Sequence, residues 1–173
     1  MDYVVGKGVS QTELSNWLEL AAEKYGRFTD GRINYKDAKE APAVMCVLKC
    51  GDEILLAKRG YGLADANGYW STINGFIDED KPLSQIAAQE FSEELSLTID
   101  PKSIKVASSY KMKSQHEKRS YIIFPCLAVI DHKPTIKLDR EHTEFAWIKR
   151  QDLEKYHILD DLPLVVDSAL KLF

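Results

Sequence analysis

The sequence lacks the long apolar runs, the excess of basic residues and the internal repeats that mark several large classes of protein. No apolar stretch among its 173 residues approaches the roughly 20 that cross a bilayer, so we expect no membrane partner. The 23 Lys and Arg residues are outnumbered by 27 Asp and Glu residues, and the net charge of -4 argues against a nucleic-acid partner. The first residues also lack the basic region and apolar stretch of a signal peptide.

Cysteine is scarce as well, which limits the roles that it can play. The chain has three cysteines, Cys46, Cys50 and Cys126, and they form no CxxC pair. Structural zinc sites normally combine Cys and His ligands in closely spaced pairs, so the sequence predicts no such site. We expect the three to be small apolar side chains of a reduced, cytoplasmic protein.

The chain has the length of one domain with a short appendage. Ser10 and Glu13 form a capping-box pattern, and apolar residues then recur at helical spacing, so we predict a helix over 11–24. Polar residues and glycines follow, as in a connector. We therefore divide the chain into an N-terminal helix and connector, 1–42, and a main domain, 43–173.

Beyond the connector, strand-like runs surround one long helix. Residues 43–49 and 53–59 are typical of a hairpin because a turn that contains glycine joins them. Pro82 opens a helix that we predict to end near Leu95, since proline is tolerated in a first turn. Further strands are predicted at 69–76, 103–110, 120–130, 135–137 and 145–148, and further helices at 152–156 and 162–172. Helices before, within and after a mixed set of strands indicate an α/β sandwich.

The helix that begins at Pro82 carries three acidic residues on one face. Glu90, Glu93 and Glu94 are related by three and four positions, while the apolar stripe that contains Phe91 lies on another face. Their charges repel, and they lie toward the helix C-terminus, where the dipole disfavours anions. Helix geometry alone is typical of a solvated acidic face, but clustered carboxylates also suit Mg²⁺ or Mn²⁺.

The residues around these carboxylates resemble the Nudix box of the Nudix (MutT-like) hydrolase family. That pattern is Gly-x5-Glu-x7-Arg-Glu-apolar-x-Glu-Glu-x-Gly-apolar. The positions of this chain that match it are Gly75, Glu90, Phe91, Glu93, Glu94 and Leu97. The run ILLAKR before the box and the run EHTEFAWI after it also resemble the family, so the likeness covers about residues 43–173.

The box is degenerate at several positions. Lys81 stands where the pattern has its first Glu, and Gln89 stands where it has Arg. In the family, this Glu and Arg help to hold the loop and the helix together. Both are absent here, so neither is left without the other, and Gln89 can still donate a hydrogen bond. Ser96 replaces the late Gly in a turn that is expected to need a positive φ, which costs about 1 kcal/mol for a residue with a side chain. Asn74 replaces the Gly that usually precedes Gly75.

The resemblance implies an α/β/α sandwich with a mixed sheet, here preceded by the N-terminal helix. It implies hydrolysis of a diphosphate linkage in a small-molecule nucleoside diphosphate derivative, a class that includes nucleotides, nucleotide sugars and dinucleotides. Glu90, Glu93 and Glu94 would then be the metal ligands. They would hold Mg²⁺ (or Mn²⁺), which neutralises phosphate charge and activates a water molecule.

The catalytic base stays open among four residues, because the family varies at this point. Glu93 and Glu94 lie in the box, and Glu141 and Glu144 lie just before the strand that contains Trp147. The alternative for the last two is surface charge on a turn.

Substrate contacts are implied for three residues outside the metal set. Arg59 could bind phosphate, Tyr61 could stack on a base, and Gly75 opens the box. The N-terminal helix has three open roles, which are to cover the sheet, to bridge two subunits of a homodimer, or to cap the substrate site.

Two other functions compete with hydrolysis. The degenerate box motivates a catalytically weak Nudix domain that acts as a nucleotide-ligand binding or regulatory module. Isopentenyl diphosphate isomerases have a similar fold but use a cysteine near the position where this chain reads STINGFID, which contains none.

Overall fold

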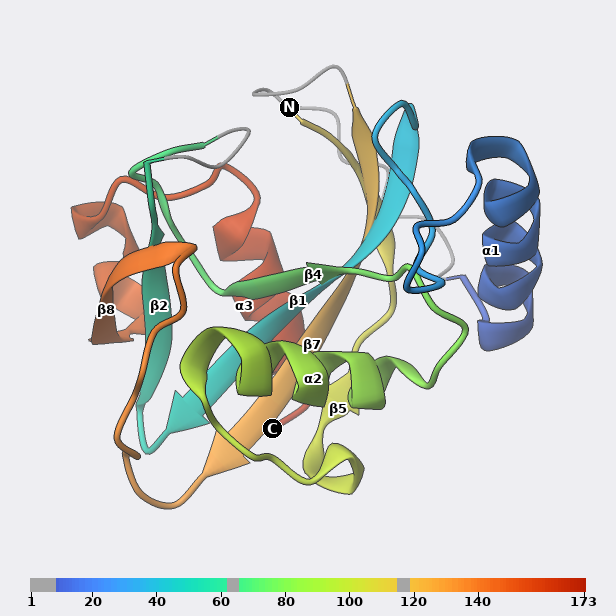
Figure 1. The fold of residues 1–173 in the computed structure, drawn as a ribbon. Helices are drawn as coiled ribbons and strands as arrows, with labels where there is room; N and C mark the ends of the chain where they lie inside the picture. Colours follow the sequence, from blue (N-terminus) through green and yellow to red (C-terminus); the bar gives the residue numbers. More distant parts are fainter. Residues whose placement is uncertain (1–8, 62–65, 115–118) are drawn as a thin grey trace.

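A mixed sheet organises the part of the chain that the computed structural model describes, residues 9–61, 66–114 and 119–173. Helix α2 covers one face of this sheet and helix α3 covers the other (Figure 1). The strands are β1 (Glu40–Cys50), β2 (Glu53–Arg59), β3 (Trp70–Ser71), β4 (Ile73–Phe76), β5 (Lys105–Val106), β6 (Tyr110–Lys113), β7 (Ser120–Ile130) and β8 (His142–Lys149). The helices are α1 (Gln11–Tyr25), α2 (Leu83–Leu95) and α3 (Leu162–Leu170), with 3-10 helices at Pro101–Ser103 and Arg150–Lys155. The predicted α/β/α sandwich with an N-terminal helix is confirmed.

Strand β1 forms the centre of the sheet. It pairs in parallel with β7 along its whole length, from Glu40 opposite Ser120 to Cys50 opposite Ile130. It also pairs antiparallel with β2 and with β4, and β2 pairs antiparallel with β8. Because side chains alternate between the faces of a strand, β1 contributes to one core beneath α2 and to a second core beneath α3.

Helix α1 begins where the sequence predicts. The hydroxyl of Ser10 accepts from the backbone N–H of Glu13, and the carboxylate of Glu13 accepts from the backbone N–H of Ser10. Leu14, Leu18 and Ala21 are buried in the core that also contains the apolar face of α2. The apolar face of α1 therefore packs against this core. Within the described residues, no helix has the length and apolar character that crossing a membrane requires.

The connector after α1 packs against the segment between β4 and α2. Tyr35 donates its hydroxyl proton to the carbonyl oxygen of Ile77 at 2.6 Å, and the backbone N–H of Ile33 donates to that of Asp78 at 3.1 Å. The connector is thus fixed to the loop that leads into α2.

The predicted strand at 135–137 is wrong. The backbone N–H groups of Lys137 and Asp139 donate instead to the carbonyl oxygens of Leu95 and Glu94, at 3.2 and 3.1 Å. These carbonyls lie in the last turn of α2, where helix geometry leaves them without a partner in the helix. The connection between β7 and β8 therefore closes the end of α2 rather than extending the sheet.

Smaller differences have similar local causes. The run at 103–110, predicted as one strand, is divided into β5 and β6, which both pair with β7. The division lies opposite Pro125, which has no N–H to donate to a neighbouring strand; its carbonyl accepts from the N–H of Ala107. Cys46 and Cys126 are buried opposite one another in β1 and β7, and all three cysteines are free thiols.

Candidate metal centre

Helix α2 places Glu90 directly over Gly75. Gly75 lies in β4, where it pairs with Val44 of β1. A Cβ atom at position 75 would lie 2.0 Å from Oε1 of Glu90 and 2.1 Å from its carboxyl carbon. Only glycine therefore leaves room for the Glu90 carboxylate in this place.

Glu94 lies deeper in the molecule than Glu90, one helical turn further along α2. Its side chain is only 8% exposed, and no atom of the described residues forms a hydrogen bond with its Oε2. Nε2 of His142 lies 3.7 Å from that oxygen, which is beyond hydrogen-bond range. A buried carboxyl oxygen without a partner is costly unless a proton or a cation satisfies it.

Burial and like charges raise the pKa of both carboxyl groups. Burial is the main cause for Glu94, whose pKa rises to about 10, and the charges of Glu90, Asp139 and Glu141 add to it. The pKa of Glu90 rises to about 8, again chiefly by burial and then through the charge of Glu93. Without a cation the two groups therefore hold protons at neutral pH, and a bound metal would displace them.

Glu93, the third carboxylate of α2, is exposed. Its Oε1 accepts a hydrogen bond of 2.8 Å from Nε2 of Gln89, one turn earlier. The prediction that Gln89 can still donate a hydrogen bond is thereby confirmed. Lys81, which stands where the family pattern has its first Glu, pairs with Glu79 at 2.6 Å.

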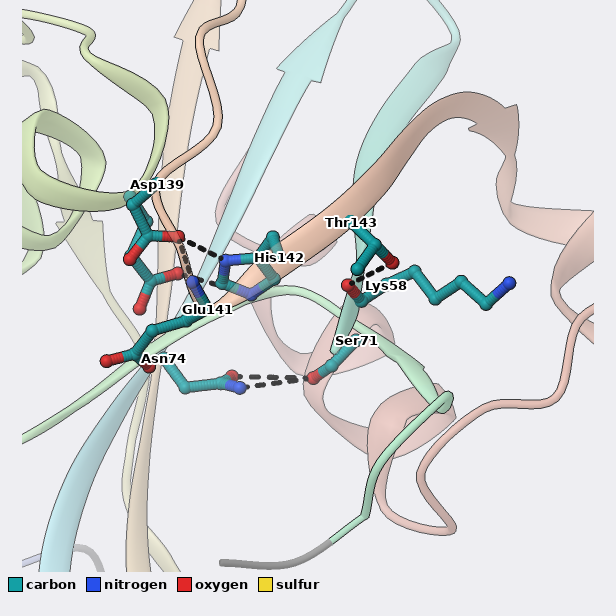
Figure 2. A network of polar contacts seen from close by, with 8 residues as sticks. Lys58, Ser71, Asn74, Asp139, Glu141, His142 and Thr143 are labelled. Carbon is teal, nitrogen blue, oxygen red and sulfur yellow. Dashed lines mark hydrogen bonds and ion pairs between the residues drawn. The ribbon is translucent and has the colours of Figure 1, made fainter. Parts of the chain in front are cut away.

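The segment that leads into β8 brings a second group of polar side chains to the α2 carboxylates. Asp139 accepts through Oδ1 from the backbone N–H of Glu141 at 3.0 Å, and the same oxygen lies 3.1 Å from Nδ1 of the buried His142 (Figure 2). Glu141 is exposed, and its charge raises the pKa of both Glu90 and Glu94. It therefore faces the same site as the α2 carboxylates.

Glu144, the other candidate from this segment, lies on the opposite face of the sheet. It pairs with Lys58, its cross-strand partner in β2, at 2.7 Å. Lys58 alternates along β2 with Ala57, which belongs to the core beneath α2, so Lys58 and Glu144 face the α3 side. Figure 2 shows the Lys58 side chain extending away from Asp139 and His142.

The residues predicted to contact substrate are divided between the site and the surface. Arg59 lies opposite His142 in the β2–β8 pairing, and its charge lowers the pKa of Glu94 against the larger effect of burial. Tyr61 is 82% exposed and packs near Gly68. Gly75 lies beneath Glu90, as described above. The rest of the loop after Tyr61, residues 62–65, lies outside the described residues.

The donor set fits a divalent cation in its chemistry. Carboxylate oxygens suit Mg²⁺ and Mn²⁺, and Oε2 of Glu94 has no hydrogen-bond partner in the described part of the chain. In that same part, no three His, Cys, Asp or Glu side chains converge closely enough to hold a metal ion as they stand. A bound cation would thus be coordinated partly by the protein carboxylates and partly by oxygens of water or substrate. Mg²⁺ commonly retains several water ligands in proteins.

Sequence reasoning missed three residues of this site. Asp139 and His142 lie next to a recognised candidate, and a polar DREH run before a strand was the available signal. Arg32 comes from the connector, and its charge favours the ionised form of Glu90. Nothing in the sequence pattern indicates that the connector reaches α2.

One of the comparisons with known proteins identifies a family. A model of the NUDIX domain matches residues 39–166. A search of the curated proteins gives no match. Among solved structures, an Ap4A hydrolase of C. elegans in a binary complex is 17% identical, with a TM-score of 0.60 over 74% of this chain and 93% of that chain.

Two further structures show the same fold. The NUDIX domain of Shewanella oneidensis NrtR, complexed with ADP ribose, is 18% identical, with a TM-score of 0.64 over 77% of this chain and 88% of that chain. A bifunctional NMN adenylyltransferase/ADP ribose pyrophosphatase of Francisella tularensis, complexed with AMP and a manganese ion, is 15% identical, with a TM-score of 0.64 over 94% of this chain and 48% of that chain. Because the family model spans most of its length, this chain belongs to the NUDIX domain family.

Proposed function

We propose that this chain is a metal-dependent pyrophosphohydrolase that cleaves a diphosphate linkage in a nucleoside diphosphate derivative. The observation that carries the proposal is the pair of raised-pKa carboxyl groups, Glu90 over Gly75 and the buried Glu94, within a NUDIX domain. Structural neighbours bind ADP ribose and AMP, which supports a nucleotide-derived substrate.

The α2 carboxylates would bind the metal, and a neighbouring carboxylate would act as the general base. Glu90, Glu93 and Glu94 would hold Mg²⁺ or Mn²⁺. When bound, such a cation neutralises charge on the diphosphate and lowers the pKa of an attacking water. Glu141 is the general base that we favour, because it is exposed and its charge reaches both Glu90 and Glu94. Its carboxylate would accept the proton that the water loses.

Arg59 has a role in substrate binding in this proposal, whereas Glu144 has none. The guanidinium of Arg59, opposite His142, would bind a diphosphate oxygen as substrate approaches the carboxylates. Glu144 is left out, because its ion pair with Lys58 lies on the other face of the sheet.

The test is hydrolysis by the purified chain with Mg²⁺, with Mn²⁺ and with chelator, against dinucleoside polyphosphates, nucleotide sugars and nucleoside triphosphates. We expect turnover of at least one class that depends on the cation. Glu141→Gln should lower kcat by about 10²–10⁴-fold if Glu141 is the base. Glu19→Gln, an exposed change on α1, serves as the control and should leave kcat unchanged.

A catalytically weak binding module is the second candidate. Gln89 in place of the box arginine favours it, as does the lack of three converging metal-binding side chains in the described residues. Tight nucleotide binding with no turnover under any cation, and unchanged binding in Glu94→Gln, would replace the enzyme proposal with this one.

A further inference from the structure

His142 is buried between two carboxyl groups. Its side chain is 3% exposed, with Nδ1 at 3.1 Å from Oδ1 of Asp139 and Nε2 at 3.7 Å from Oε2 of Glu94. Glu94 is the carboxylate of α2 whose Oε2 has no hydrogen-bond partner in the described residues. A polar ring thus lies behind the most deeply buried acidic group of the proposed metal centre.

Asp139 fixes the orientation of this ring. Its Oδ1 already accepts from the backbone N–H of Glu141, so it faces donors on both sides. An ionised carboxylate can only accept, and therefore Nδ1 of His142 carries the proton in this contact. Nε2, on the other side of the ring, is directed at Oε2 of Glu94. It can donate to an ionised Glu94 carboxylate only when both ring nitrogens carry a proton. Asp139 is itself held to α2, because its backbone N–H donates to the carbonyl oxygen of Glu94 at 3.1 Å.

A β-bulge brings His142 to this face of the sheet. Lys58 pairs with Glu144 but Arg59 pairs with His142, so Thr143 is an extra residue in β8. Without it, strict alternation would place His142 on the same side as Glu144, facing α3. The N–H of Gly60 donates to the carbonyl oxygen of Glu141 at 2.7 Å, which holds the strand beside the bulge.

We propose that His142 is a positioning residue for Glu94, held in register by Asp139 so that the Glu94 carboxylate is presented to a divalent cation. The inference rests on the proposed function. Outer-shell partners that orient a metal-binding group usually contribute 10–100-fold to metal affinity. Hydrogen bonds within active sites are often long in the free enzyme and tighten in the substrate complex.

The experiment measures the dissociation constant of Mn²⁺ for the purified, folded chain, by electron paramagnetic resonance of free Mn²⁺. His142→Ala should weaken binding by about 10–100-fold. His142→Gln places an amide near the position of Nε2 and should recover much of the affinity, a rescue that a purely space-filling role would not produce. His132→Asn is the matched control, since His132 is exposed on the same β7–β8 connection.

Each result has a defined meaning. Wild-type affinity in His142→Ala, or equal loss in the Ala and Gln variants, overturns the role of His142 and leaves the proposed function standing. A wild-type chain that binds no Mn²⁺ overturns the proposed function and this inference with it. If His142→Ala does not fold, Asp139→Asn decides, because it keeps the ring but weakens its anchor: weaker Mn²⁺ binding supports the proposal, and unchanged binding contradicts it.

Discussion

At the scale of single residues, Gly75 matters for the atom that it lacks. We predict that Gly75→Ala displaces the Glu90 carboxylate, because the new Cβ would lie 2.0 Å from Oε1. The backbone of Gly75 does not require a positive φ, and the clash is with the end of a long side chain, so the fold should survive. Mn²⁺ affinity should fall on the order of 10–100-fold, measured by titration alongside a melting curve.

The combination with Glu90→Ala provides the control for Gly75. If the methyl group acts only through Glu90, the double variant Gly75→Ala/Glu90→Ala should bind Mn²⁺ no more weakly than Glu90→Ala alone. Additive losses would show that Gly75 acts on the site by another route.

A second residue-scale prediction concerns pH. The pKa values of Glu90 and Glu94 are about 8 and about 10 in the folded chain, well above the usual 4.5. At a pH between 4.5 and these values, the folded chain therefore binds more protons than the unfolded chain. The contribution of these two groups to the free energy of unfolding, in the absence of metal, should therefore be greatest below about pH 4.5. It should fall as the pH rises from there through the pKa values of the folded chain. Melting curves in chelator from pH 6 to 9 measure this effect.

Glu94→Gln isolates the contribution of one group to that slope. The amide keeps the shape of the side chain but does not ionise, so the melting temperature of the variant should decline less steeply with pH than that of the wild type. Parallel curves for the two proteins would contradict the assignment. Mg²⁺ should stabilise the wild type increasingly as pH rises, since the cation binds the deprotonated carboxylates.

At the scale of elements, helix α2 ends on a residue that the fold strains. Ser96 has φ 56° and ψ 36°, and the turn is closed by the N–H of Ser96 to the carbonyl of Ser92 and the N–H of Leu97 to that of Phe91, both 3.1 Å. The predicted positive φ is confirmed. Ser96→Gly should stabilise the chain by about 1 kcal/mol, a rise of roughly 2–4 °C in melting temperature. Ser92→Gly, an exposed change inside the same helix, should lower stability by about 0.5 kcal/mol.

Sequence patterns predicted some elements well and others poorly, for identifiable reasons. Helix α1 was predictable because its capping box is local, and the ends of β2 and β7 because turns or polar runs bound them. The predicted strand at 135–137 is wrong because the N–H of Lys137 donates to Leu95 at the end of α2, 42 positions earlier in the sequence, a contact that periodicity does not reveal. The bulge in β8 could not be predicted from the sequence for the same reason, since the register of a strand depends on its partner strand.

At the scale of the whole molecule, the candidate site draws on segments that are well separated in the sequence. The spacing of the α2 carboxylates could be read from the sequence because it lies within one helix, whereas Asp139 and His142 approach them through the β7–β8 connection and Arg32 through the connector. Only the tertiary fold joins these segments. The division at residue 42 and the homodimer stay predictions.

The parallel pairing of β1 with β7 joins parts of the chain that lie far apart in the sequence. Every paired residue is separated from its partner by eighty positions, as Glu40 is from Ser120, so the centre of the sheet forms only after a long loop has closed. Chains dominated by such distant contacts fold slowly, on a scale of milliseconds to seconds. The entire box lies inside that loop. Asp139 and His142 follow β7 in the sequence, so the full set of side chains around Glu94 exists only once the chain has been synthesised past residue 142.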